Sequence, residues 1–311
     1  MKIQDEKTYD SVFWTGLVMM REFFIPLVNE VFGENYSEHA IIRLMHNKQV
    51  IEHWDGSLEQ GEMDALAEVS EAGIAKDYHI ETESGFGQRM AIRIAEYAVG
   101  TAYDSIDVTK SGARMTIPHS AVIFLRAGDE VPDEYVMEIN YPGGEVFYGV
   151  PVIRIKDYGI DELFEKKLFL LLPYYGFVFE KEFSKMETEG IEELKVVFDK
   201  IDNRLSDSVE VGVIDETQRS HLLDWSKRVL EKLTYGYTTV AKGVEDLMGG
   251  YILHTRTDDI LDLGREQGGM EREREIISDM LHRGKKPEEI ADFCGFPIEL
   301  VEEVEKALLV N

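Results

Sequence analysis

The sequence has little of what would place a protein outside the cell or in a membrane. Its single cysteine, Cys294, excludes an internal disulfide and fits a reducing cytoplasm. Residues 1–7 contain no apolar run behind a basic cluster, so we expect no signal peptide. The most apolar stretch, 168–179, includes Pro173 and is about a dozen residues long, whereas a membrane span needs roughly 20. We therefore expect a cytoplasmic protein without membrane contact, in which 168–179 is a buried helix.

Basic residues are also scarce. The chain has 33 Lys and Arg against 61 Asp and Glu, which gives a net charge of −28. DNA-binding proteins draw much of their affinity from Lys and Arg that release counterions from phosphates, so this charge disfavours a nucleic-acid partner. The segment 84–126 is an exception in which basic residues outnumber acidic ones. Its charged residues are Arg89, Arg93, Lys110, Arg114 and Arg126, against Glu96, Asp104 and Asp107.

The apolar pattern changes along the chain. The first half holds most of the strand-like segments, and the part after residue 157 is helical almost throughout. We predict an α/β core with an all-helical C-terminal extension. The predicted regions are the core at 1–157, the helical extension at 158–250, and a tail at 251–311 with a charged helix and a small helix-turn-helix-like pair.

Individual elements follow from apolar spacing and from turn residues. Pro26 kinks the first helix or starts a second one, and Gly33 suits a left-handed cap at its end. The dipeptide Ala72-Gly73 is expected to turn one strand into the next. The predicted helices are 11–32, 88–103, 160–185, 187–207, 215–235 and 241–247, and the predicted strands are 40–54, 63–70, 77–84, 120–126, 135–140 and 145–155.

The segment 77–84 carries the residues with the clearest chemical potential. Alternation along a strand puts Glu81 and Glu83 on one face, with His79 beside them. If the strand that begins near Asp64 pairs with this one, three carboxylates converge, and they repel one another unless a cation lies among them. Oxygen ligands of this kind suit Mg²⁺ or Mn²⁺, which can activate water against a phosphodiester.

Spacing alone favours a plainer alternative, namely a half-exposed strand with a polar outer face. His79 could accept a proton, although a lone histidine on a strand is more often a surface residue. On the following helix, Arg89 and Arg93 are one turn apart and could hold a phosphate. A solvated helix face, or packing of Arg93 on Tyr97, explains the same spacing.

Four segments of the chain carry a resemblance through their order and spacing, and they are Leu27–Tyr36, Tyr78–Ser84, Pro118–Arg126 and Ile160–Lys167. Together they resemble the Rpn-type recombination-promoting nucleases, also described as putative transposases of the PD-(D/E)XK nuclease superfamily. The resemblance covers most of the chain.

The resemblance implies a restriction-endonuclease-like fold, a mixed sheet flanked by helices with a metal site at the carboxylate hairpin. It also implies DNA cleavage with a divalent cation in recombination or mobile-element biology. Asp64 matches the motif aspartate and Glu81 the motif glutamate. Glu83 takes the position where the superfamily has lysine and many Rpn-type chains have glutamine. Glu30 matches an additional acidic residue near the metal.

Our leading hypothesis from the sequence is a Mg²⁺-dependent (or Mn²⁺-dependent) DNA endonuclease. Asp64, Glu81 and Glu83 would be its catalytic metal ligands, Glu30 a further ligand, and Arg89 and Arg93 phosphate-binding residues. The alternative is a catalytically inactive nuclease-fold protein that acts as a protein-interaction or regulatory module, which Glu83, the net charge and the helical half favour. A third reading is a nuclease inhibited by its own acidic helices. The C-terminal helices are candidates for a homodimer contact.

Overall fold

The computed structural model describes residues 3–45, 48–52, 58–85, 89–126, 131–183 and 188–248, together with 278, 281, 285–287, 290, 301 and 306. The chain divides into two compact units, Met1–Ile252 and Leu253–Asn311. The fold below is that of the first unit. The charged helix and helix-turn-helix-like pair predicted for 251–311 lie almost entirely outside the described residues.

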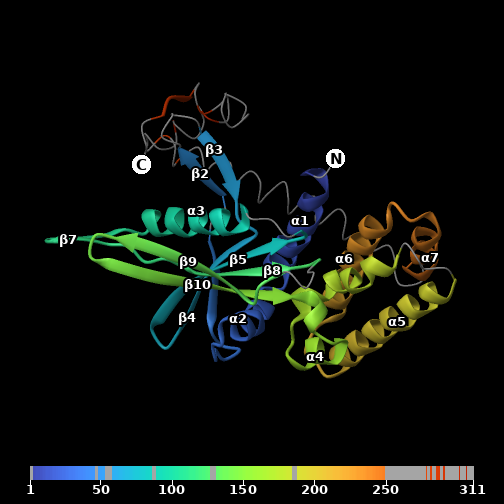
Figure 1. The fold of residues 1–311 in the computed structure, drawn as a ribbon. Helices are drawn as coiled ribbons and strands as arrows, with labels where there is room; N and C mark the ends of the chain where they lie inside the picture. The colour runs from blue at the N-terminus through green and yellow to red at the C-terminus, as the bar shows by residue number, and fades with distance from the viewer. Residues whose placement is uncertain are drawn as a thin grey trace. The chain divides into compact units, whose positions relative to one another are not determined.

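A six-stranded mixed sheet forms the centre of the first unit, in the order β1-β4-β5-β8-β10-β9 (Figure 1). Strands β1, β4 and β5 are antiparallel neighbours, β8 is parallel to both β5 and β10, and β9 pairs antiparallel with β10. This confirms the predicted α/β class. The strands are β1 (Ile41–Leu44), β4 (Ala65–Glu71), β5 (Ile74–Glu83), β8 (His119–Phe124), β9 (Glu134–Tyr141) and β10 (Gly144–Arg154).

Helices cover both faces of this sheet. On one face lie α1 (Ile3–Met19) and α2 (Phe24–Phe32), whose apolar residues share a core with Tyr78 and Ile80. On the other face lies α3 (Arg89–Asp104), which packs against Val122 and Phe124 (Figure 1). Because both faces are covered, residues 78–82 of β5 are buried without interruption. The half-exposed strand that spacing alone suggested is therefore wrong.

The N-terminal helical region is bent by 105° between Tyr9–Met19 and Arg21–Phe32, which are joined by the 3₁₀ turn η1 (Arg21–Phe23). The second helix starts just before Pro26, whose missing N–H breaks no helical bond in a first turn. Gly33 ends this helix with φ 64°, the predicted left-handed cap. Among the described residues no single helix is long and apolar enough to cross a membrane, and only this bent pair meets the criteria of length and composition.

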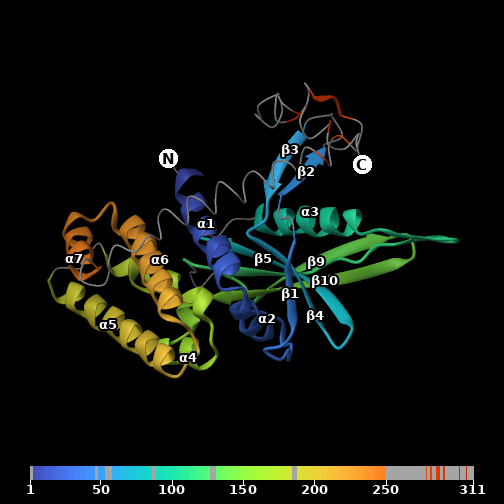
Figure 2. The same cartoon turned by 180° about the vertical axis from the view of Figure 1, so that it is seen from behind.

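From Ile155 to Met248 the described part of the unit is helical, as predicted for the chain after residue 157, and it shares the core of the sheet. Residues 168–179 are buried as predicted, but they form a 3₁₀ helix, η3, in place of an α-helix. Figure 2 shows α6 beside α1, where Trp225 packs over Gly16. The elements are η2 (Ile155–Asp157), α4 (Ile160–Glu165), η3 (Phe169–Glu182), α5 (Thr188–Glu210), α6 (Glu216–Thr234) and α7 (Thr238–Met248).

Two small antiparallel pairs stand apart from the main sheet. They are β2 (Lys48–Glu52) with β3 (Leu58–Glu62), and β6 (Asp107–Thr109) with β7 (Gly112–Arg114). The sequence pattern gave no indication of β3, β6 or β7, because these strands are short and carry few apolar residues.

Candidate functional site

The β4–β5 hairpin brings Asp64 and Glu81 together, as the sequence predicted. Ala72 and Gly73 form its turn with positive φ angles of 52° and 81°, the geometry that matches the twist of a tight hairpin. The register pairs Ala65 with Ile80 and so places Asp64 beside Glu81. The backbone N–H of Asp64 donates a hydrogen bond to Glu81 Oε1 at 3.2 Å.

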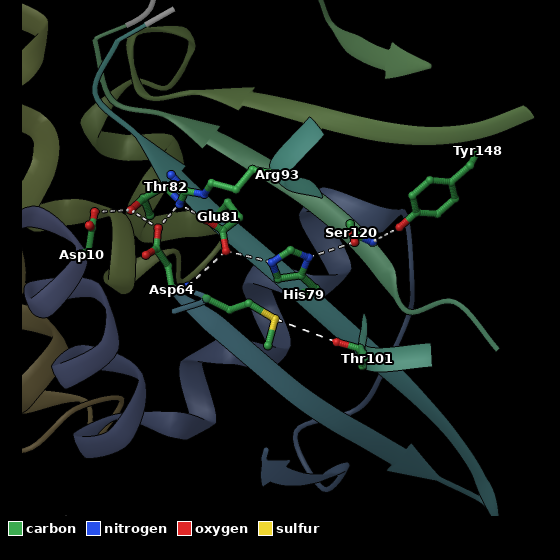
Figure 3. Close-up of polar contacts among 10 residues, drawn as sticks. Asp10, Asp64, His79, Glu81, Thr82, Arg93, Thr101, Ser120 and Tyr148 are labelled. Carbon is green, nitrogen blue, oxygen red and sulfur yellow. Dashed lines mark hydrogen bonds and ion pairs between the residues drawn. The ribbon is translucent and has the colours of Figure 1, made fainter. Parts of the chain in front are cut away.

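Glu81 is fully buried, and its carboxylate has three donors within the protein (Figure 3). His79 Nε2 lies 2.8 Å from Oε1, and Arg93 forms an ion pair with Oε2. A carboxylate only accepts hydrogen bonds, so His79 Nε2 carries a proton. Burial raises the pKa of Glu81, but His79 and Arg93 outweigh it, and the net pKa lies below its ordinary value.

His79 is also fully buried, so the expectation of a surface histidine is wrong. Its Nδ1 lies 3.0 Å from Ser120 Oγ, across the parallel β5–β8 pairing. The imidazole is therefore held at both nitrogens, between Ser120 and Glu81. It belongs to a closed hydrogen-bond network and has no open side for a substrate among the contacts that the structure shows.

Asp64 directs its carboxylate toward the helical layer of α1. Its Oδ2 accepts hydrogen bonds from Thr82 N at 2.6 Å and from Thr82 Oγ1 at 2.7 Å, and Thr82 Oγ1 lies 3.3 Å from Asp10 Oδ1 (Figure 3). Burial raises the pKa of Asp64 well above its ordinary value, and the negative charges of Glu81 and Asp10 raise it further. Asp64 and Glu81 are therefore close in space but hydrogen-bonded to opposite layers.

The other predicted ligands lie elsewhere. Glu83 accepts a hydrogen bond from the backbone N–H of Gly85 at 3.1 Å. Glu30 lies on α2 and binds Tyr158 Oη at 3.0 Å and Lys166 Nζ at 2.8 Å. The side chain of Arg89 lies outside the described residues.

A divalent metal does not fit this arrangement. In the part of the chain that the structure describes, no group of three or more His, Cys, Asp or Glu side chains could hold one. Two donors occupy the lone pairs of Glu81 Oε1, and a guanidinium occupies Oε2. A Mg²⁺ or Mn²⁺ ion at Glu81 would have to displace Arg93 and overcome its positive charge.

Three residues of this network, Asp10, Thr82 and Ser120, did not stand out in the sequence. His79 and Ser120 are partners in the β5–β8 register, but a parallel pairing across a crossover helix leaves no local signal. Asp10 joins the network only because α1 crosses the end of β5. Comparisons with protein-family models, curated proteins and solved structures found no match for this chain.

Proposed function

We propose that this chain is a nuclease-fold protein of the PD-(D/E)XK type whose carboxylate centre does not hydrolyse DNA, and that it acts by binding another protein. The observation that carries the proposal is the occupied carboxylate of Glu81, which is bonded to His79, Arg93 and the backbone of Asp64. The resemblance to Rpn-type nucleases supports the nuclease fold. The closed carboxylate centre supports a role other than DNA hydrolysis.

The order of elements supports the nuclease-type core. A hairpin, β4–β5, carries the two motif carboxylates, the helix α3 follows it, and β8 then returns parallel to β5. The first helices cover the opposite face. This is a mixed sheet flanked by helices with the carboxylates at one strand end, as the resemblance implies.

Electrostatics disfavour hydrolysis at this centre. A catalytic Mg²⁺ requires carboxylate oxygens with free lone pairs, and Glu81 has at most one left. Glu83, which stands where the superfamily has lysine, cannot polarise an attacking water as a cation would. The net charge of −28 repels a polyanion at long range.

The β9–β10 ribbon supports a role in protein binding. Its residues Met137 and Tyr148 pack against the α3 cluster, and the side chains one step further along the same face are exposed. These are Ile139, Tyr141 and Val146, with 42%, 54% and 51% of their surface accessible. A contiguous exposed apolar strip of this kind is typical of a protein contact surface.

The catalytic half of the proposal is tested with purified protein, supercoiled plasmid and Mg²⁺ or Mn²⁺. We expect no cleavage above that of the Asp64→Ala variant, because the Glu81 carboxylate is already bonded to His79 and Arg93, and no binding heat on titration with Mn²⁺ at millimolar concentration. Metal-dependent cleavage by the wild type that disappears in both Asp64→Ala and Glu81→Ala would show that the chain is a nuclease.

The binding half is tested by purification from the native cells and identification of stoichiometric partners. We expect Val146→Glu to lose a partner that the wild type retains, because a charge in the apolar strip opposes its burial. Val196→Glu is the matched control, since Val196 is an exposed valine on α5 with 66% of its surface accessible. A partner retained by Val146→Glu and by Tyr141→Glu would exclude the ribbon as its binding site.

A further inference from the structure

We infer that the guanidinium of Arg93 is a built-in counter-ion of the buried Glu81 carboxylate and takes the place that a divalent cation would otherwise have there. The inference rests on the proposed function, because it explains how the centre is stable without metal. It goes further in predicting that this one side chain keeps cations away from Glu81, and that its removal raises the affinity of this carboxylate for divalent cations.

Arg93 is placed for this role by the chain itself. Helix α3 begins soon after β5 ends and runs back over the face on which Glu81 lies. The guanidinium forms an ion pair with Glu81 Oε2, and its central carbon lies 5.9 Å from the centre of the Tyr97 ring one helical turn further on. Tyr97 also contacts His79 edge to face, with ring centres 5.7 Å apart. Arg93 is therefore held over the carboxylates by an aromatic side chain that belongs to the same cluster.

The hydrogen bonding of Arg93 indicates that its charge is what matters. Within the described part of the chain, its buried Nε has no hydrogen-bond partner. It forms an ion pair with Glu81, and its positive charge also lowers the pKa of Asp64, against the larger effects that raise it. An arginine that served mainly as a hydrogen-bond donor would donate from several of its five guanidinium N–H groups. Arg93 instead supplies a permanent positive charge to a set of carboxylates.

The charges around this point are unbalanced without Arg93. The negative charges of Asp10 and Glu81 both raise the pKa of Asp64, and Thr82 Oγ1 lies within hydrogen-bond distance of both Asp10 and Asp64. Carboxylates this close either bind protons or bind a cation. Once the guanidinium is gone, Glu81 Oε2 is free and the buried carboxylate has lost its counter-ion, and its oxygen is of the kind that Mn²⁺ and Mg²⁺ prefer.

The experiment measures Mn²⁺ binding to the full-length protein by calorimetry and by the metal dependence of the melting temperature. We expect Arg93→Gln to bind Mn²⁺ at least about tenfold more tightly than the wild type. Arg93→Lys is the charge-matched control and should not gain binding, because the ammonium still repels the metal. Arg126→Gln is the control for loss of an ion-paired arginine elsewhere, since Arg126 pairs with Glu180.

Equal Mn²⁺ responses of Arg93→Gln and the wild type would overturn the inference, as would an equal gain in Arg93→Lys or Arg126→Gln. If Arg93→Gln does not fold, Arg93→Ala is refolded with and without millimolar Mn²⁺ and followed by circular dichroism. Metal-dependent folding supports the inference, and its absence overturns it. A wild type that itself binds Mn²⁺ and cuts DNA would instead refute the proposed function, so the two failures are distinguishable.

Discussion

Replacing Glu81 by glutamine should lower the free energy of unfolding by about 3 kcal/mol, which is near the lower end for breaking a buried ion pair. The value is near the lower end because the Arg93 side chain is 36% exposed and water can partly solvate its charge. The glutamine would still accept hydrogen bonds from His79 and Asp64 N–H, but its amide would face the guanidinium donor to donor. Chemical denaturation followed by circular dichroism measures the loss.

The matched control is Glu83→Gln, which changes the same residue type on the same face of β5. Glu83 is only partly buried and accepts a hydrogen bond from the exposed N–H of Gly85, so we expect a loss of under about 1 kcal/mol. The pH dependence adds a second check. The pKa of Glu81 is lowered on folding, so its stabilisation is present above the ordinary value of 4.5 and is lost as the pH falls. The difference in free energy of unfolding between the wild type and Glu81→Gln should therefore become smaller at acidic pH. A difference that does not change with pH would contradict this account.

Asp64→Asn should have the opposite effect and stabilise the protein at about pH 8 by roughly 1 kcal/mol, or about 2–4 °C in melting temperature. Asp64 has a raised pKa, so the folded state holds a proton that the unfolded state releases, and stability falls as the pH rises above the ordinary value of 3.8. The asparagine removes this cost, and its carbonyl oxygen still accepts hydrogen bonds from Thr82 N and Oγ1.

Melting curves of the wild type and Asp64→Asn between about pH 4 and pH 8 measure this effect. The gain should disappear toward pH 4, where the wild-type carboxyl is protonated. Asp161→Asn is the control on an exposed aspartate that pairs with Lys200, and its pKa is lowered, so any pH effect has the reverse sign. A wild type more stable than Asp64→Asn at every pH would show that the Asp64 charge is favourable and that the centre is better compensated than we infer.

Much of the fold could be predicted from the sequence because it rests on local patterns. The apolar alternation of 63–70 and 77–84, with Ala72-Gly73 between them, is enough to place Asp64 beside Glu81. The long helices of the second half have strong apolar spacing and were found close to their true bounds. The 3₁₀ form of η3 and the bend near Met20 depend on packing and left no such pattern.

The chemistry of the centre was less predictable, because it depends on what covers the sheet. The position of α3 over β5 decides whether the Arg93 side chain points to solvent or contacts Glu81. The spacing of residues in the sequence does not predict this position. The burial of His79 has the same cause. The sequence identified the carboxylates and the arginine separately, and their pairing emerged only in three dimensions.

Because side chains alternate along β5, the neighbours Glu81 and Thr82 point to opposite faces of the sheet. Glu81 pairs with Arg93 of α3, whereas Thr82 bonds Asp64 and contacts Asp10 of α1. The polar network thus passes around the end of a single strand and links both helical layers. Separation of α3 would leave the buried Glu81 carboxylate without Arg93, and separation of α1 would break the contact between Thr82 and Asp10. We therefore expect the sheet and both helical layers of the first unit to unfold cooperatively, because all three are connected at the end of β5.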